Sequence, residues 1–221
     1  MNNILAEKFK CFIFDLDGTL TDTVDDLAAA FNHMRRKFGF PEITRQEMTG
    51  LIGNGMYEVI RKSYVDMQIN APAEEIERAL KTMLDYYLEH TVELTVPYPG
   101  VRETLERLRQ KNCRLAVVTN KFTAAALNVL QTLELSEYFD HVFGNGEGFP
   151  LKPAPDLLLL AAERCGVAAS DCVMVGDNYT DLGAARAANM KSIFCSYGYG
   201  SQENEKAVWQ INSFKELEEF A

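Results

Sequence analysis

The sequence predicts an α/β protein, in which a doubly wound, parallel, Rossmann-like sheet carries an inserted all-helical domain. First, the apolar run 11–14 ends at two carboxylates, Asp15 and Asp17, which is typical of a buried parallel strand ending at a functional site. Second, strand and helix patterns alternate from residue 101 to residue 195. Third, helical patterns follow one another between residues 24 and 90, and no strand is needed there.

The first strand is followed by a predicted helical insert. A helix over 24–38 is closed by Gly39 and Pro41, and Thr44-Arg45-Gln46-Glu47 has the form of a capping box that opens the next helix. Two more helices are expected over 56–65 and from about residue 72 to residue 88. Pro97 and Pro99-Gly100 then mark a turn. We therefore expect a core of residues 1–21 and 97–221 and an inserted domain of residues 22–96.

The remaining core elements alternate. Helices are predicted over 101–111, 123–133, 156–165 and 181–188, and strands over 114–119, 141–143, 172–175 and 192–195. This order implies right-handed crossovers and a sheet covered by helices on both faces. The acidic tail Glu216–Glu219 is expected to be the solvated face of a helix.

Composition narrows the class of protein. The 221 residues are 47% hydrophobic and carry a net charge of −10, so there is no surplus of Lys and Arg for binding nucleic acid or an anionic membrane. Five cysteines without Cys-x-x-Cys spacing indicate free buried thiols in a reducing compartment. The N-terminus lacks a signal-peptide pattern, and no apolar stretch approaches the length of a membrane span. A cytoplasmic protein is expected.

Polar groups follow several predicted strands where each strand ends. Besides the Asp15–Asp17 pair, they are Thr119-Asn120, Lys152 in a proline-rich loop, and Gly176-Asp177 with Asp181. Each has a simpler explanation alone: an Asp-Gly turn, a helix cap or a solvated surface lysine. Their order at successive strand ends favours one shared site, and a hard cation such as Mg²⁺ would offset the repulsion between close carboxylates.

These residues carry a family resemblance. The stretches 15–19, 119–120, 152–153 and 176–181 resemble the four motifs of the haloacid dehalogenase superfamily, in which most members are phosphatases. The helical insert resembles the C1 cap of that superfamily. Within it, the stretches 17–27, 51–55 and 98–101 are most similar to phosphoglycolate phosphatases.

The resemblance implies roles for the core residues. Asp15 would be the carboxylate nucleophile and Asp17 the general acid and base. Thr119 and the backbone N–H of Asn120 would hold phosphate oxygens, and Lys152 would offset the negative charge.

The resemblance also implies a metal site and a substrate loop. Mg²⁺ would be held by the Asp15 and Asp177 carboxylates and the Asp17 carbonyl, with Asp181 as a further ligand or an anchor. Gly53-Asn54-Gly55 would present backbone N–H groups to a small ligand, although a plain turn between helices explains the same residues.

The expected partner is a small phosphorylated metabolite, most of all 2-phosphoglycolate. Pyrophosphate, nucleotides and sugar phosphates remain alternatives. A phosphoglucomutase-like mutase is disfavoured because Leu27 stands where such enzymes carry a histidine, and a phosphonate hydrolase because 51–56 contains no lysine. A non-catalytic regulatory protein of the same fold is the alternative from another class. The sequence leaves open whether the chain is a monomer or a homodimer.

Overall fold

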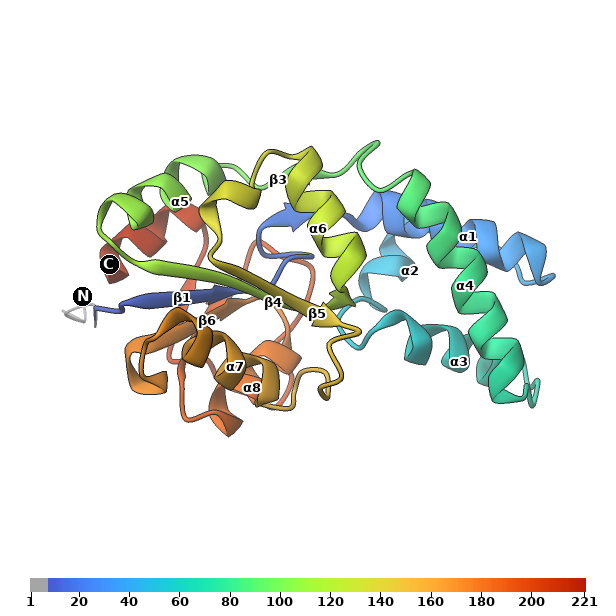
Figure 1. Cartoon of the computed structure of the whole chain (residues 1–221). Coiled ribbons are helices and arrows are strands. Elements are labelled where there is room, and N and C mark those ends of the chain that lie inside the picture. The colour runs from blue at the N-terminus through green and yellow to red at the C-terminus, as the bar shows by residue number, and fades with distance from the viewer. Residues whose placement is uncertain (1–7) are drawn as a thin grey trace.

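The protein is built on a six-stranded parallel sheet with strand order β5-β4-β1-β6-β7-β8 (Figure 1). The computed structural model describes residues 8–221. Residues 1–7 were predicted to belong to the core and to lack a signal-peptide pattern, and they lie outside the described part. The strands are β1 (Cys11–Phe14), β4 (Arg114–Phe122), β5 (His141–Asn145), β6 (Cys172–Gly176), β7 (Lys191–Cys195) and β8 (Trp209–Ile211). The predicted doubly wound sheet is confirmed.

The register of the sheet brings three strand ends together. Phe14, the last residue of β1, is paired with Val117 of β4 on one side and Val175 of β6 on the other. Asp15 comes one residue after Phe14, whereas Thr119 and Asp177 come two residues after Val117 and Val175. All three residues therefore lie at the same edge of the sheet. The chain winds outward from β1 in both directions, and such a switch point is where open α/β sheets bind ligands.

Alternating side chains of β1 pack into two apolar layers. Phe12 and Phe14 join the cluster beneath α5 (Val101–Gln110), α6 (Thr123–Thr132) and the C-terminal 3₁₀ helix Phe214–Phe220. Cys11 and Ile13 face α7 (Asp156–Cys165) and α8 (Tyr179–Ala187). Because β1 is buried on both faces, its sequence is a continuous apolar run.

Four helices stand beyond the carboxyl ends of the strands, at the right of Figure 1. They are α1 (Val24–Lys37), α2 (Arg45–Thr49), α3 (Met56–Asp66) and α4 (Ala73–Glu89). They enclose a separate apolar cluster that includes Phe31, Ile60 and Met83. The predicted capping box of α2 is present, with Thr44 and Glu47 bonded to each other's backbone N–H.

A pair of two-residue strands connects the core to these helices. β2 (Thr21–Asp22) and β3 (Val96–Pro97) run antiparallel, so the outgoing and returning chains are bonded side by side. The boundaries expected at residues 21/22 and 96/97 fall inside this pair. The sequence did not predict it, because two residues are too few for a strand pattern.

The C-terminal segment differs from expectation. β8 adds a strand at the edge of the sheet, and the acidic tail forms a 3₁₀ helix. The tail is not simply a solvated face, because Leu217, between the glutamates, and Phe214 and Phe220, on either side of them, are buried in the core. α8 begins at Tyr179, two residues earlier than predicted.

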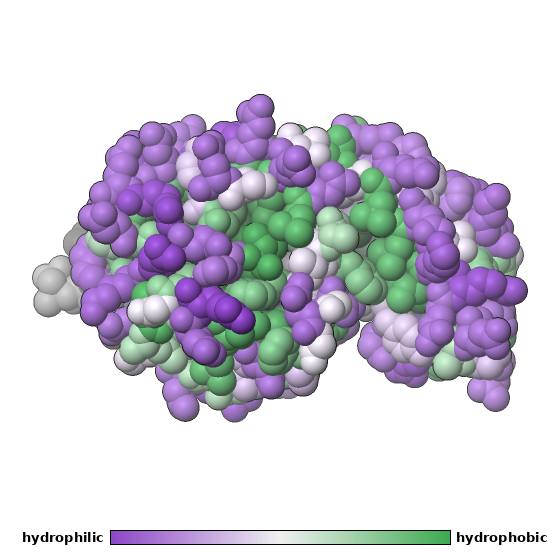
Figure 2. Space-filling model, in the orientation of Figure 1, coloured by the Kyte–Doolittle hydropathy of each residue, from purple (hydrophilic) through white to green (hydrophobic). Residues whose placement is uncertain are grey.

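The surface is polar over most of the visible face. Figure 2 shows hydrophilic residues around the edges and hydrophobic residues across the middle, where the core meets the four helices. The exposed apolar residues include Leu88 of α4 and Leu127 of α6. All five cysteines are free and buried, as predicted. Among residues 8–221, no helix has the length and apolarity needed to cross a membrane.

Candidate active site

Three buried carboxylates meet at the carboxyl ends of β1 and β6. One oxygen each of Asp15, Asp177 and Asp181 lies within 4.8 Å of the others. Burial, together with the nearby Asp15 and Asp181 charges, raises the pKa of Asp177 well above its ordinary value. Burial raises the pKa of Asp181 to about 7 against the lowering effect of Lys152, and the Asp15 charge adds to the increase. Three ionised carboxylates so close together need positive charge nearby.

Lys152 supplies part of that charge from a buried position. Its ammonium Nζ lies 2.9 Å from Asp15 Oδ1 and 2.7 Å from Asp181 Oδ1, and it donates to the Val118 carbonyl. Burial alone would lower the pKa of Lys152, but the Asp15 and Asp181 carboxylates raise it above its ordinary value. Lys152 is therefore a fixed cation inside the site and not the solvated surface lysine of the simpler explanation.

Asp177 is held from three sides. It accepts hydrogen bonds from the backbone N–H groups of Tyr199 and Gly200 and from the Thr19 hydroxyl. A Cβ at Gly18, where φ is +89°, would lie 2.3 Å from Asp177 Oδ2. The glycine of the Asp-x-Asp-Gly stretch is thus needed both for its backbone conformation and for the close approach of this carboxylate.

Asp181 occupies the third position of α8 and not its cap. Asn178 is the N-cap: its side chain accepts from the Thr180 N–H, while Asp181 Oδ2 accepts from the Asn178 N–H. The alternative explanation of Asp181 as the N-cap is wrong. This arrangement leaves Oδ1 of Asp181 for Lys152.

Asp17 lies apart from the acidic cluster and faces the four helices. It accepts a hydrogen bond from Thr23, and Lys121 Nζ lies 2.9 and 3.0 Å from its two carboxylate oxygens. The Lys121 ammonium also lies 4.6 Å from the centre of the Tyr87 ring, which comes from α4. Sequence analysis missed Lys121, although its place directly after Thr119-Asn120 at a strand end was a usable signal.

Thr119 and Asn120 lie within β4, so Thr119 is not a helix cap. The Thr119 hydroxyl accepts from the Lys121 N–H. The Asn120 side-chain amide donates to the carbonyls of Gly53 and Lys152, and its oxygen accepts from the Lys152 N–H. Asn120 therefore joins the second and third motifs to the helical insert.

The Gly53-Asn54-Gly55 loop rests on the core beside these residues. Asn54 Oδ1 accepts from the Tyr179 hydroxyl at 2.5 Å, in addition to the bond between Asn120 and Gly53. Gly53 and Gly55 have φ of +120° and +82°, and a Cβ at Gly53 would lie 2.6 Å from the Asn178 amide. The loop is thus more than a turn between helices, since it contacts two of the four motifs.

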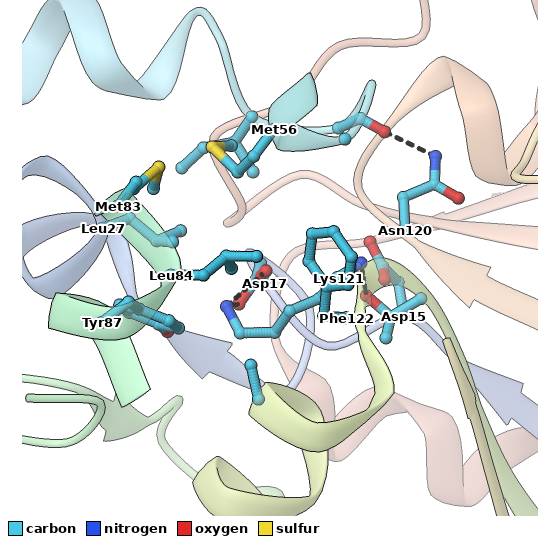
Figure 3. Close-up of a pocket in the computed structure, with 15 residues that line it drawn as sticks. Asp15, Asp17, Leu27, Met56, Met83, Leu84, Tyr87, Asn120, Lys121 and Phe122 are labelled. Carbon is cyan, nitrogen blue, oxygen red and sulfur yellow. Dashed lines mark hydrogen bonds and ion pairs between the residues drawn. The ribbon is translucent and has the colours of Figure 1, made fainter. Parts of the chain in front are cut away.

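A cavity of about 40 Å³ lies between the core and the insert, and Asp15 and Asp17 form part of its wall. In Figure 3 the Lys121 side chain extends below Leu84 to reach Asp17, with Tyr87 to the left of its ammonium group. The remaining wall is largely apolar: Leu27, Ile52, Met56, Met83, Leu84, Phe122 and Ala125. The charged side chains of the cavity come from the core, and the Tyr87 side chain of α4 adds a hydroxyl group from the insert.

Residues 12–195 match the haloacid dehalogenase-like hydrolase family. The chain belongs to this family. It is 34% identical to a phosphoglycolate phosphatase of Neisseria meningitidis, with 98% of this chain and 95% of the relative covered. It is 39% identical to a phosphoglycolate phosphatase of Nitrosospira multiformis, with 86% and 84% covered. A solved structure described as a predicted phosphoglycolate phosphatase from Haemophilus somnus superposes with a TM-score of 0.87 at 27% identity, with 95% and 96% covered.

The acidic cluster of this haloacid dehalogenase-like hydrolase suits a hard divalent cation. Asp15, Asp177 and Asp181 offer oxygen ligands, which Mg²⁺ prefers. Asp15 Oδ1 is buried and accepts no hydrogen bond, even though Lys152 lies close to it. Lys152 supplies one positive charge to three buried carboxylates, so a bound cation would offset the negative charge that remains.

Proposed function

We propose that this haloacid dehalogenase-like hydrolase is a Mg²⁺-dependent phosphomonoester hydrolase whose substrate is 2-phosphoglycolate. The observation that carries the proposal is the Asp15 carboxylate, which lines the cavity with one oxygen free of hydrogen bonds, beside Lys152 and the acidic cluster. The relatives named phosphoglycolate phosphatase support the choice of substrate.

The first step is a displacement at phosphorus. An Asp15 carboxylate oxygen forms a bond to phosphorus, and the bond between phosphorus and the ester oxygen breaks. Asp17 gives its proton to the departing alkoxide, so the products are an aspartyl-phosphate and an alcohol. Asp17 is suited to this role because its carboxylate lines the cavity two residues from Asp15.

The second step returns the enzyme to its starting state. Asp17, now a carboxylate, removes a proton from a water molecule as the water oxygen bonds to phosphorus. The bond between phosphorus and the Asp15 oxygen then breaks, releasing inorganic phosphate. Asp17 ends the cycle protonated, and Asp15 ends it as a carboxylate.

Groups of the chain stabilise the phosphoryl charge in both steps. The Thr119 hydroxyl and the Asn120 backbone N–H hold phosphoryl oxygens. The Lys152 ammonium offsets the negative charges of Asp15 and of the phosphoryl group. Asp15, Asp177, Asp181 and the Asp17 carbonyl would hold Mg²⁺, which when bound supplies positive charge to a phosphoryl oxygen.

The cavity favours a compact leaving group. Its largely apolar wall offers few of the hydrogen-bonding partners that the hydroxyl groups of a nucleotide or a hexose would need. We propose that residues 22–96 act as a cap over the core formed by residues 1–21 and 97–221, with Gly53, Asn54 and Gly55 next to the substrate. A cytoplasmic location fits such a metabolite phosphatase.

The test is release of inorganic phosphate from 2-phosphoglycolate and from a panel that includes pyrophosphate, a nucleotide and hexose phosphates. We expect activity that requires Mg²⁺, is absent from Asp15→Asn and has its highest kcat/KM for 2-phosphoglycolate. Activity that persists in Asp15→Asn or in excess chelator would contradict the mechanism. A higher kcat/KM for another ester would contradict the substrate alone.

A further inference from the structure

The cavity contains a buried cation that the proposed chemistry does not use. Lys121 is the only basic residue among the described residues that line the cavity. Its side chain is 5% exposed. Lys152 is already engaged by two carboxylates and a carbonyl, whereas the neighbours of the Lys121 ammonium are Asp17 and the face of the Tyr87 ring.

A second polar group beside Lys121 lacks a partner. The Tyr87 side chain is 2% exposed, and its hydroxyl makes no hydrogen bond. A buried hydroxyl without a partner is unfavourable, and buried polar groups in native proteins are normally satisfied. Lys121 and Tyr87 thus place an ammonium and an unused hydroxyl donor on the wall of one cavity.

We propose that Lys121 and the Tyr87 hydroxyl bind the carboxylate of the leaving group, and that this contact selects phosphate esters of short 2-hydroxy acids. This inference rests on the proposed phosphatase function. It goes further by naming the residues that recognise the part of the substrate beyond the phosphoryl group.

The position of Lys121 relative to Asp17 carries the argument. Asp17 must contact the ester oxygen to protonate it, and Lys121 Nζ lies 2.9 Å from an Asp17 oxygen. In an ester of a 2-hydroxy acid, the carboxyl carbon is only two bonds from that ester oxygen. A cation bound to Asp17 is therefore within reach of this carboxylate.

The rest of the wall fits the same class of compound. Apart from Tyr87, the side chains that the helical insert contributes to the cavity wall, among them Leu27, Met83 and Leu84, offer no hydrogen bonds to the hydroxyl groups of a sugar. A short carbon chain ending in a carboxylate needs only apolar contacts and one anion-binding group. The ion pair of Lys121 with both Asp17 carboxylate oxygens, at 2.9 and 3.0 Å, holds this ammonium on the cavity wall.

The test compares 2-phosphoglycolate with ethyl phosphate, in which a methyl group replaces the carboxylate. In Mg²⁺, wild-type kcat/KM for 2-phosphoglycolate should exceed that for ethyl phosphate. Lys121→Met should reduce this ratio by about 10- to 100-fold, the range of a hydrogen bond between charged groups. Lys121→Arg should keep most of the ratio, and Tyr87→Phe should reduce it by a smaller factor. Lys62→Met, at an exposed position of α3, should leave it unchanged.

Other outcomes overturn the proposal. If Lys121 only positions Asp17, Lys121→Met lowers kcat/KM for both esters equally and the ratio stays constant. A wild-type enzyme that hydrolyses both esters equally well contradicts the proposal without any variant, so the test does not depend on the folding of Lys121→Met. If the wild type hydrolyses no phosphate ester, or Asp15→Asn remains active, the proposed function itself fails. Asp15-dependent hydrolysis with an unchanged ratio overturns only the role of Lys121.

Discussion

The ammonium of Lys152 lies 2.9 Å from Oδ1 of Asp15, an oxygen that accepts no hydrogen bond. The Lys152 side chain is 1% exposed, so this charge acts in a poorly solvated site where electrostatic interactions are strong. The contact holds Asp15 next to a cation without using the oxygen as a hydrogen-bond acceptor. Asp15 is thus held beside a fixed positive charge at the end of β1.

Replacing Lys152 should remove most of the activity. We expect Lys152→Met to lower kcat by about 10²–10³ or more, because a positioned charge in the site is lost. Lys10→Met is a matched control, since Lys10 forms an exposed ion pair with Asp171 far from the site. The measurement is phosphate release from 2-phosphoglycolate. A Lys152→Met enzyme within about tenfold of wild type would contradict the assigned role of Lys152.

Mg²⁺ should stabilise the folded protein through the acidic cluster. We expect Mg²⁺ at about 100 times its Kd to raise Tm by about 5–10 °C, because the ion binds only the folded arrangement of Asp15, Asp177 and Asp181. Asp177→Asn should abolish most of this increase. The measurement is thermal unfolding with and without chelator, and an unchanged Tm shift in Asp177→Asn would exclude Asp177 as a ligand.

The same variant should change how stability depends on pH when metal is absent. The pKa of Asp177 is raised in the folded state, so the folded protein binds more protons than the unfolded chain between the ordinary and the raised pKa. The free energy of unfolding therefore loses a contribution from this group as the pH rises through that interval. In chelator, Asp177→Asn should be more stable than wild type by an amount that grows as the pH rises above about 4, the ordinary pKa of an aspartate. A constant difference would show that the Asp177 pKa is not raised.

Much of the core site could be predicted because each motif residue follows an apolar run. Asp15, Thr119 and Asp177 stand at strand ends that the sequence itself marks, and a parallel sheet brings such ends together. Lys121 stands at the same strand end as Thr119, so its place near the site could be predicted, but its contacts with Asp17 and Tyr87 could not, because these partners are distant in the sequence. β8 was missed since a three-residue edge strand has too short a pattern.

The loop contact between Gly53 and Asn120 should matter for activity more than for stability. Gly53→Ala places a Cβ 2.6 Å from the Asn178 amide at a φ of +120°, so the loop cannot keep its contact with the core. We expect kcat/KM to fall by about tenfold or more, as for other displaced positioning groups. Gly39→Ala is the matched control, because Gly39 also has a positive φ but has no atom within 4 Å of the added Cβ. Equal loss of activity in both variants would mean that backbone strain alone is responsible.

Asp26 should stabilise the connection between α1 and the returning chain, and the adjacent Asp25 should not. Asp26 is 4% exposed and accepts hydrogen bonds from the backbone N–H groups of Glu93, Leu94 and Thr95 and from the Thr95 hydroxyl. Asp26→Ala leaves these buried donors without an acceptor, and we expect it to lower the free energy of unfolding by about 2–4 kcal/mol.

Asp25 pairs with Arg45 at the surface, where such pairs contribute little, so Asp25→Ala should lower the free energy of unfolding by less than about 1 kcal/mol. Chemical denaturation of both variants measures the difference. Both residues are acidic and lie in the first turn of α1, so a favourable interaction with the helix dipole would act on both alike. Equal destabilisation by the two variants would therefore attribute the effect to that dipole and exclude the contact with residues 93–95.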